Sequence, residues 1–182
     1  MPLPPTPQSS SSTGSASVTL SPVGLAANQP WGVVTSFAGT ASQTSGTTFY
    51  LTQAGTCLGG QFYWAPNTTR TVRVSLWDFH TRTRLAFIDV SVSGTGTYSG
   101  TFASSVALNA YQTYTVSFFE MSGTDYSYFN SNTSSSPVMG PLAPRPGGPG
   151  FEWGTWANWS GSDVFPASVA GTERYPVGPV LG

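Results

Sequence analysis

Two neighbouring stretches decide the fold: TVRVSLW at residues 71–77 and LAFIDVSVS at residues 85–93. Apolar and polar residues alternate in both, which is the period of a β-strand, whose successive side chains point to opposite faces. In the first stretch Val72, Val74 and Leu76 share one face. The matching face of the second stretch holds Ala86, Ile88, Val90 and Val92. The pair therefore predicts two strands with their apolar faces on a common core.

The polar residues 78–84 connect these two strands and predict a hairpin turn. Outward along the chain, similar short runs predict further strands, separated by Gly, Asn and Pro. They span residues 17–21, 31–35, 47–52, 61–64, 98–102, 106–108, 114–118 and 175–180, the last as an edge strand because of its prolines. This spacing predicts an all-β, antiparallel β-sandwich of jelly-roll or immunoglobulin-like shape.

Composition excludes several classes of function. Only 7% of residues are charged, lysine is absent, and the net charge is −1. Six scattered arginines cannot form the basic surface that binds a nucleic-acid backbone, so we expect no nucleic-acid partner. No stretch has the roughly 20 apolar residues of a membrane helix, so we expect no membrane partner. Aromatic residues at 14% indicate a folded chain rather than a disordered one.

Two segments of low complexity organise the chain. Residues 1–17 are rich in Pro and Ser and predict an extended arm, followed by a sandwich domain over residues 18–182. A Pro- and Gly-rich loop at residues 134–150 interrupts that domain. The N-terminus has neither the basic region nor the apolar region of a secretory signal. We therefore expect the protein to stay where it is made or to leave inside an assembled particle.

The residues that carry chemistry are few. A hydrolase would use His80, the single histidine, with Asp78; an exposed turn histidine is the favoured interpretation. One histidine and one cysteine cannot fill a zinc site. A calcium site would need Asp125 or Asp163 with loop carbonyl oxygens, and we expect no metal and no cofactor. The remaining acids are dispersed, and Cys57 is expected to be buried and inert.

A cluster of tryptophans in the C-terminal part is the most distinctive binding candidate. Trp153, Trp156 and Trp159 lie among Gly, Asn and Ser, next to Phe151. Such rings can stack on neutral sugars, which need aromatic faces and amides rather than charge. The favoured interpretation is instead that they cap one end of the sandwich or pack under the Pro-rich loop. A third is that they anchor a protein interface, where tryptophan is enriched.

An ordered set of short motifs resembles a bacterial extracellular β-sandwich domain family of unknown function. The motifs lie within residues 46–180: Gly46 to Phe49, Phe62-Tyr63, Ser75 to Trp77, Tyr114 to Phe118, and Phe165-Pro166. The resemblance implies a small β-sandwich and no assigned chemistry. Members of this family typically occur as repeats in large surface-associated proteins. This chain departs from the pattern in its longer connection after Trp77.

These features predict a non-enzymatic structural protein of a bacteriophage virion, such as a capsid decoration, fibre or tail component. Its expected partners are other virion proteins or further copies of itself, contacted through residues 1–17 and the aromatic surface. The alternative is a carbohydrate-binding or adhesion module on a bacterial cell surface, which would use the three tryptophans. A virion protein can also bind glycans, so the two hypotheses overlap.

Overall fold

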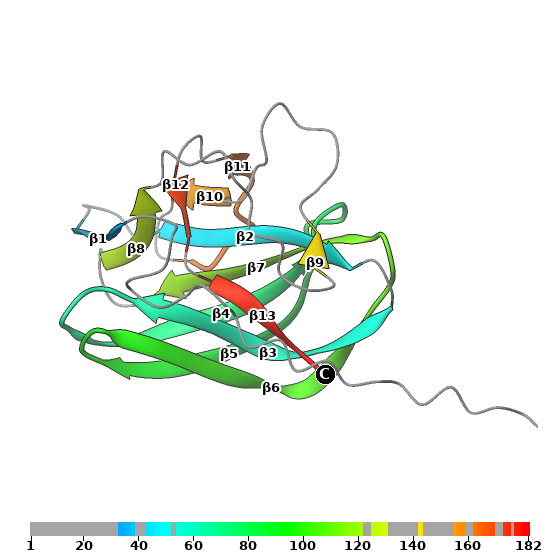
Figure 1. The fold of residues 1–182 in the computed structure, drawn as a ribbon, viewed down its shortest axis with the longest axis horizontal. Helices are drawn as coiled ribbons and strands as arrows, with labels where there is room; N and C mark the ends of the chain where they lie inside the picture. The colour runs from blue at the N-terminus through cyan, green and yellow to red at the C-terminus, as the bar shows by residue number, and fades with distance from the viewer. Residues whose placement is uncertain are drawn as a thin grey trace, which may run out of the picture.

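The computed structural model describes residues 33–38, 43–51, 54–121, 125–130, 142–143, 155–158, 162–169, 173–175 and 177–182. All regular elements in these ranges are β-strands, and two antiparallel sheets pack face to face (Figure 1). The predicted all-β, antiparallel sandwich is therefore confirmed. Residues 1–17, and nearly all of the loop at residues 134–150, lie outside the described ranges, as does the strand expected at residues 17–21.

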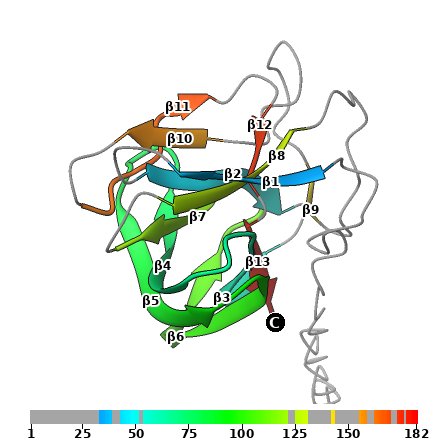
Figure 2. The same cartoon turned by 90° about the vertical axis from the view of Figure 1, so that its left-hand side faces the viewer.

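The larger sheet has the strand order β11-β10-β2-β7-β4-β5, with β9 paired to β2. Its strands are β2 (Gln43–Leu51), β4 (Thr69–Asp78), β5 (Arg84–Ser93), β7 (Thr113–Glu120), β9 (Leu142–Ala143), β10 (Thr155–Asn158) and β11 (Ser168–Val169). The facing sheet has the order β13-β3-β6, and it lies below β2 and β7 in Figures 1 and 2. Its strands are β3 (Gly55–Trp64), β6 (Gly96–Leu108) and β13 (Val177–Leu181).

A third, small sheet has the order β1-β8-β12. It is formed by β1 (Val33–Ala38), β8 (Asp125–Asn130) and β12 (Glu173–Arg174). A helix with the length and apolar character of a membrane span is not found among the described residues.

The core lies between the two large sheets and uses the alternating residues that the sequence indicates. Val74, Leu76 and Phe118 come from the larger sheet and are fully buried against Phe62 and Trp64 of the smaller one. The rings of Phe62 and Phe118 stack with centroids 5.9 Å apart. Burial of such side chains is the main free energy that holds two sheets together, at roughly 1.5–3 kcal/mol per side chain.

The strand predictions that fall on described residues hold, and most of these strands are longer than expected. Residues 98–102 and 106–108 belong to one strand, β6, because the two runs continue each other along the same partner, β3. The polar connection is shorter than predicted, since Asp78 ends β4 and Arg84 begins β5. The expected closing strand is β13, which, among the described strands, pairs only with β3 and so lies at the edge of its sheet. Pro179 has no backbone N–H, which is tolerated here because no strand pairs with the free side of β13 in the described structure.

Candidate functional site

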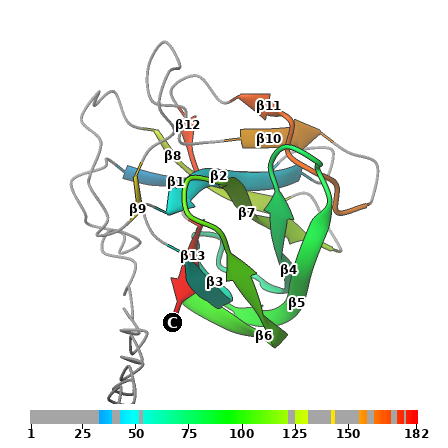
Figure 3. The same cartoon turned by 90° about the vertical axis from the view of Figure 1, so that its right-hand side faces the viewer.

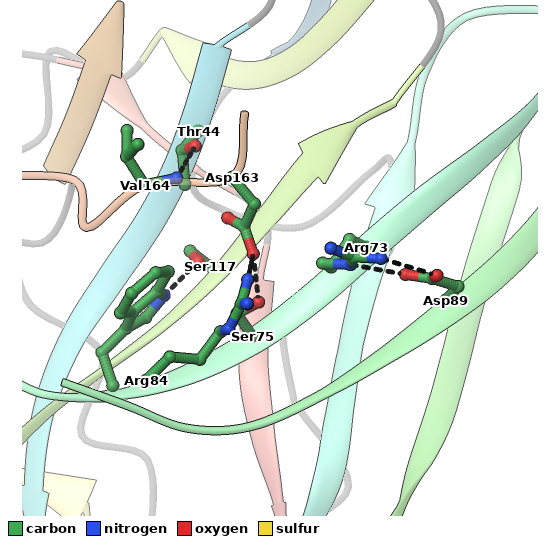
Figure 4. A network of polar contacts seen from close by, with 9 residues as sticks. Thr44, Arg73, Ser75, Arg84, Asp89, Ser117, Asp163 and Val164 are labelled. Atoms are coloured by element: carbon green, nitrogen blue, oxygen red, sulfur yellow. Dashed lines mark hydrogen bonds and ion pairs between the residues drawn. The ribbon is translucent and has the colours of Figure 1, made fainter. Parts of the chain in front are cut away.

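Two ion pairs, Arg73–Asp89 and Arg84–Asp163, lie on the outer face of β4 and β5, away from the core. Four of the six arginines lie between residues 70 and 84. Arg73 of β4 donates two hydrogen bonds to Asp89 of β5, at 2.7 and 2.9 Å (Figure 4). This hydrogen bonding lowers the pKa of Asp89 and raises that of Arg73. The pair directly joins residues that face each other across the two strands.

A segment between β10 and β11 covers part of this outer face. Asp163 Oδ2 accepts hydrogen bonds from Ser75 Oγ at 2.5 Å and from Arg84 Nη1 at 2.9 Å. The next residue, Val164, donates its backbone N–H to Thr44 Oγ1 of β2 at 3.3 Å (Figure 4). The ring of Phe165 packs edge-on against Trp77, whose indole nitrogen donates to Ser117 Oγ at 2.8 Å. We call residues 162–167 the strap.

Asp163 is the most enclosed charged group of this network. Its side chain is only 2% exposed, and its Oδ1 has no hydrogen-bond partner in the described structure. Burial raises the pKa of this carboxyl, while Ser75, Arg84 and Arg73 act in the opposite direction. The strap is therefore fixed to β4 and β5 by a carboxylate that water scarcely reaches.

Phe87 lies on the same outer face of β4 and β5, but it is exposed. Its side chain is 46% exposed, and Arg73 and Arg84 place their guanidinium carbons 4.4 and 4.8 Å from the ring centroid. The neighbouring Leu85 is 39% exposed. Two guanidinium groups therefore lie over this ring and hold it in place, and the part of the ring that they leave exposed is available to a partner.

Two loops meet at the end of the sandwich where β4, β5, β6 and β7 turn, seen toward the viewer in Figure 3. Asp78 Oδ1 accepts from the backbone N–H groups of His80 and Thr81, at 2.9 and 2.8 Å, and closes the β4–β5 turn. Asp78 Oδ2 accepts from Gln112 Nε2 of the β6–β7 loop at 2.5 Å. These hydrogen bonds lower the pKa of Asp78, and the bond from the Thr81 backbone has the largest effect.

Each of these loops holds one residue in the left-handed backbone region, which favours glycine. They are Arg82, with φ of 58°, and Tyr111, with φ of 60°. Tyr111 is also 75% exposed, the highest value among the large hydrophobic side chains of the described residues. Strained positions of this kind gather at functional sites.

A groove of about 730 Å³ opens at this end, between the start of β5 and the end of β6. Residues 84–87 form one side and residues 102–107 the other. Phe102 is buried, and Ala86 and Val106 pack partly against the core, whereas Ser104 and Ser105 are exposed. The groove has a volume typical of sites for small ligands.

Two irregularities in strand pairing produce the groove. In β6, residues 102–105 lie opposite Leu58 alone, because Thr101 pairs with Gly59 and Val106 with Cys57. In β5, the register shifts so that Arg84 pairs with Trp77, and Leu85 becomes an extra residue. Such bulges bend a strand and redirect its side chains. Here the irregularities lie on the two sides of the groove, and the one in β5 brings Arg84 to the outer face.

The structure places only part of the predicted binding cluster. Trp156 lies in β10, where its backbone pairs with Ser45 and Ser168. Its side chain is outside the described part of the structure, and so are Trp153 and Trp159. The tryptophan surface therefore stays a prediction.

The structure shows the exposure and the contacts of the other candidate residues, His80, Cys57 and Asp163. His80 is exposed, with its ring edge-on to Phe79, as expected for a turn histidine. Cys57 is fully buried, and burial raises its pKa to about 11, which makes it a poor nucleophile, as predicted. Asp163 is engaged by Ser75 and Arg84. Across the described residues, no three His, Cys, Asp or Glu side chains gather to hold a metal ion.

Sequence reasoning missed Phe87, Tyr111 and Arg84 as surface groups. One signal was available for Phe87, the large apolar residue on the otherwise polar face of its strand, in line with Asp89 and Ser91. No comparable signal marks Arg84 or Tyr111, since a bulge and a loop backbone set their exposure.

A family model described as a domain of unknown function (DUF4082) matches residues 27–177. No curated protein matches the chain.

Proposed function

This chain belongs to the DUF4082 family of domains of unknown function, and we propose that it is a non-enzymatic attachment domain. The observation that carries the proposal is the end of the sandwich with the groove. There, the exposed apolar side chains of Leu85 and Phe87 are held on strand β5 and line an open groove. Exposed aromatic groups on a rigid scaffold are typical of surfaces that bind a partner.

The polar groups nearby support attachment rather than catalysis. Ser75, the serine closest to a carboxylate in the network, is fully buried and donates to Asp163. Asp78 uses both carboxylate oxygens to hold the two loops. A nucleophile and a general base must reach a substrate, and these groups are instead used to fix the backbone. The rival hydrolase hypothesis predicts that His80→Ala abolishes an activity of the purified domain.

We propose the exterior of a bacteriophage particle or of a bacterial cell as the location of the domain. The low charge and the Pro- and Ser-rich residues 1–17 favour a virion structural protein assembled through that arm. The exposed groove favours adhesion at either location, since both surfaces meet glycans and foreign proteins. A virion location requires this chain at fixed stoichiometry in purified particles, measured by mass spectrometry. Its presence only in the cell-surface fraction would contradict that location.

Attachment itself is tested by binding of the fluorescently labelled protein to cells of the source organism and of neighbouring species. We expect saturable binding that Phe87→Ala weakens. Met121→Ala is the matched control, because Met121 is 41% exposed but lies just after β7, at the opposite end of that strand from the loops. Equal binding by both variants, or no binding to any cell, would contradict attachment through this end.

A further inference from the structure

The groove between β5 and β6 has a mixed lining without a net charge. Its apolar floor holds Ala86, Phe102 and Val106, and its rims carry the exposed Phe87 and the hydroxyls of Ser104 and Ser105. Among the described residues that line it, Arg84 is the only charged one, and its charge is balanced by Asp163 at 2.9 Å. A ligand of this groove needs no charge of its own.

The two strands that border the groove are both end strands. Within the described residues, β5 pairs only with β4, and β6 pairs only with β3. Each therefore directs unpaired backbone N–H and C=O groups toward the side of the groove. These groups can bond to any ligand that carries both donors and acceptors, such as a peptide strand or a chain of hydroxyl groups.

The irregular pairing disfavours a peptide strand. An added strand needs a regular row of backbone partners. Only residues 84–87 of β5 border the groove, and the bulge at Leu85 interrupts them. On the other side, residues 102–105 form the insertion in β6. Sugar hydroxyls do not require that spacing, because each can bond separately in its own direction.

We propose that this groove binds a neutral, linear carbohydrate chain, which would be the ligand of the attachment function proposed above. The part of the Phe87 ring that Arg73 and Arg84 leave exposed packs against C–H groups of one sugar, as aromatic side chains do with apolar surfaces. Arg84 uses one N–H group for Asp163 and retains others for sugar hydroxyls. Ser104 and Ser105 bond to the chain from the opposite rim.

Asp163 acts as a positioning residue for this site. It lies outside the groove lining and holds Arg84, which also packs over Phe87 and Trp77 at 4.8 and 5.6 Å from their ring centroids. The strap therefore fixes the direction in which Arg84 presents its free N–H groups. Removal of the carboxylate should weaken binding less than loss of Phe87 does, because the guanidinium itself remains.

The test is a titration of the full chain with neutral oligosaccharides, from disaccharides to hexasaccharides of glucose, xylose, mannose and N-acetylglucosamine. Binding is followed by calorimetry and by amide chemical shifts. We expect saturable binding of one series, with shifts at residues 84–87 and 102–107. Phe87→Ala should weaken binding at least about tenfold, as loss of a central aromatic contact does. Met121→Ala should bind like the wild type.

Two results would overturn the carbohydrate assignment. One is the absence of groove shifts with every oligosaccharide; the other is binding that Phe87→Ala leaves unchanged. If the labelled protein still attaches to cells through Phe87 in either case, attachment stands and the ligand is of another class, with a peptide strand as the next candidate. If cell attachment is also absent, both proposals fail. Circular dichroism of each variant verifies that the sandwich is folded.

Discussion

At the scale of single residues, two aspartates on one sheet face respond to their surroundings in opposite ways. Asp163 is buried under the strap and has a raised pKa, whereas Asp89 accepts two bonds from Arg73 at the surface and has a lowered pKa. Burial penalises the ionised form, and hydrogen bonding from a cation favours it. The same residue type therefore contributes to stability with opposite pH dependence at the two positions.

This difference in pH dependence can be tested with the variant Asp163→Asn. A raised pKa means that the folded state binds the proton more tightly, so the contribution of Asp163 to stability is full below its unfolded pKa, near 3.9, and falls as pH rises through the folded pKa. The gap in free energy of unfolding between the wild type and Asp163→Asn should therefore narrow with rising pH, in urea titrations from about pH 3 to 7. A gap that widens would mean that the attraction of Arg84 outweighs burial.

Asp89→Asn is the matched control. The lowered pKa of Asp89 makes its contribution full above the unfolded value and removes it as pH falls through the folded pKa. The difference in free energy of unfolding between the wild type and Asp89→Asn should therefore widen as pH rises. It should reach at most about 1 kcal/mol at low salt, because the Arg73–Asp89 pair is exposed to solvent.

At the scale of elements, the β4–β5 turn depends on the carboxylate that ends β4. Asp78 holds the N–H groups of His80 and Thr81 and the amide of Gln112. Asp78→Ala should lower the free energy of unfolding by about 1–3 kcal/mol, since it removes three hydrogen bonds to a charged acceptor. His80→Ala removes an exposed side chain of the same turn and should change the free energy of unfolding by less than about 0.5 kcal/mol. Equal losses in the two variants, measured by urea denaturation, would contradict this account.

The pairing of β3 with β6 depends on the absence of a side chain at Gly59. A Cβ at Gly59 would lie 2.0 Å from the carbonyl oxygen of Gly100 on the partner strand, and backbone cannot swing away as a side chain can. Gly59→Ala should therefore cost about 1–3 kcal/mol through forced separation of the strands. Gly96→Ala is the control, because its Cβ would meet nothing closer than 3.5 Å, at the ring of Tyr98. Thermal unfolding in which both variants match the wild type would contradict the close approach of β3 and β6.

At the scale of the whole molecule, one core joins both large sheets. Phe118 is fully buried and stacks on Phe62 of the facing sheet. Phe118→Ala should lower the free energy of unfolding by about 3–5 kcal/mol, a large part of the stability of an ordinary domain. Phe87→Ala, on the outer face, should cost less than about 1 kcal/mol. Urea titrations of the two variants separate core from surface, and similar losses would contradict the assignment of their faces.

The fold was largely predictable because the signal for it is local. Alternation in residues 71–77 and 85–93 fixes which side chains enter the core, and Val74 and Leu76 are buried as that pattern requires. The candidate site was less predictable. Phe87 carries a sequence signal, but the position of Arg84 does not, since strict alternation would put it on the core side with Ala86 and Ile88.

The sequence by itself determined the all-β sandwich, the core face of each central strand, the exposed turn at His80 and the burial of Cys57. All of these follow from the chemistry of residues close in the chain. Only the tertiary structure decided the groove and the strap. Bulges in β5 and β6 set the exposure of the groove, and Asp163 reaches Ser75 across 88 positions of sequence. Such a contact depends on how distant strands come together, which no local pattern records.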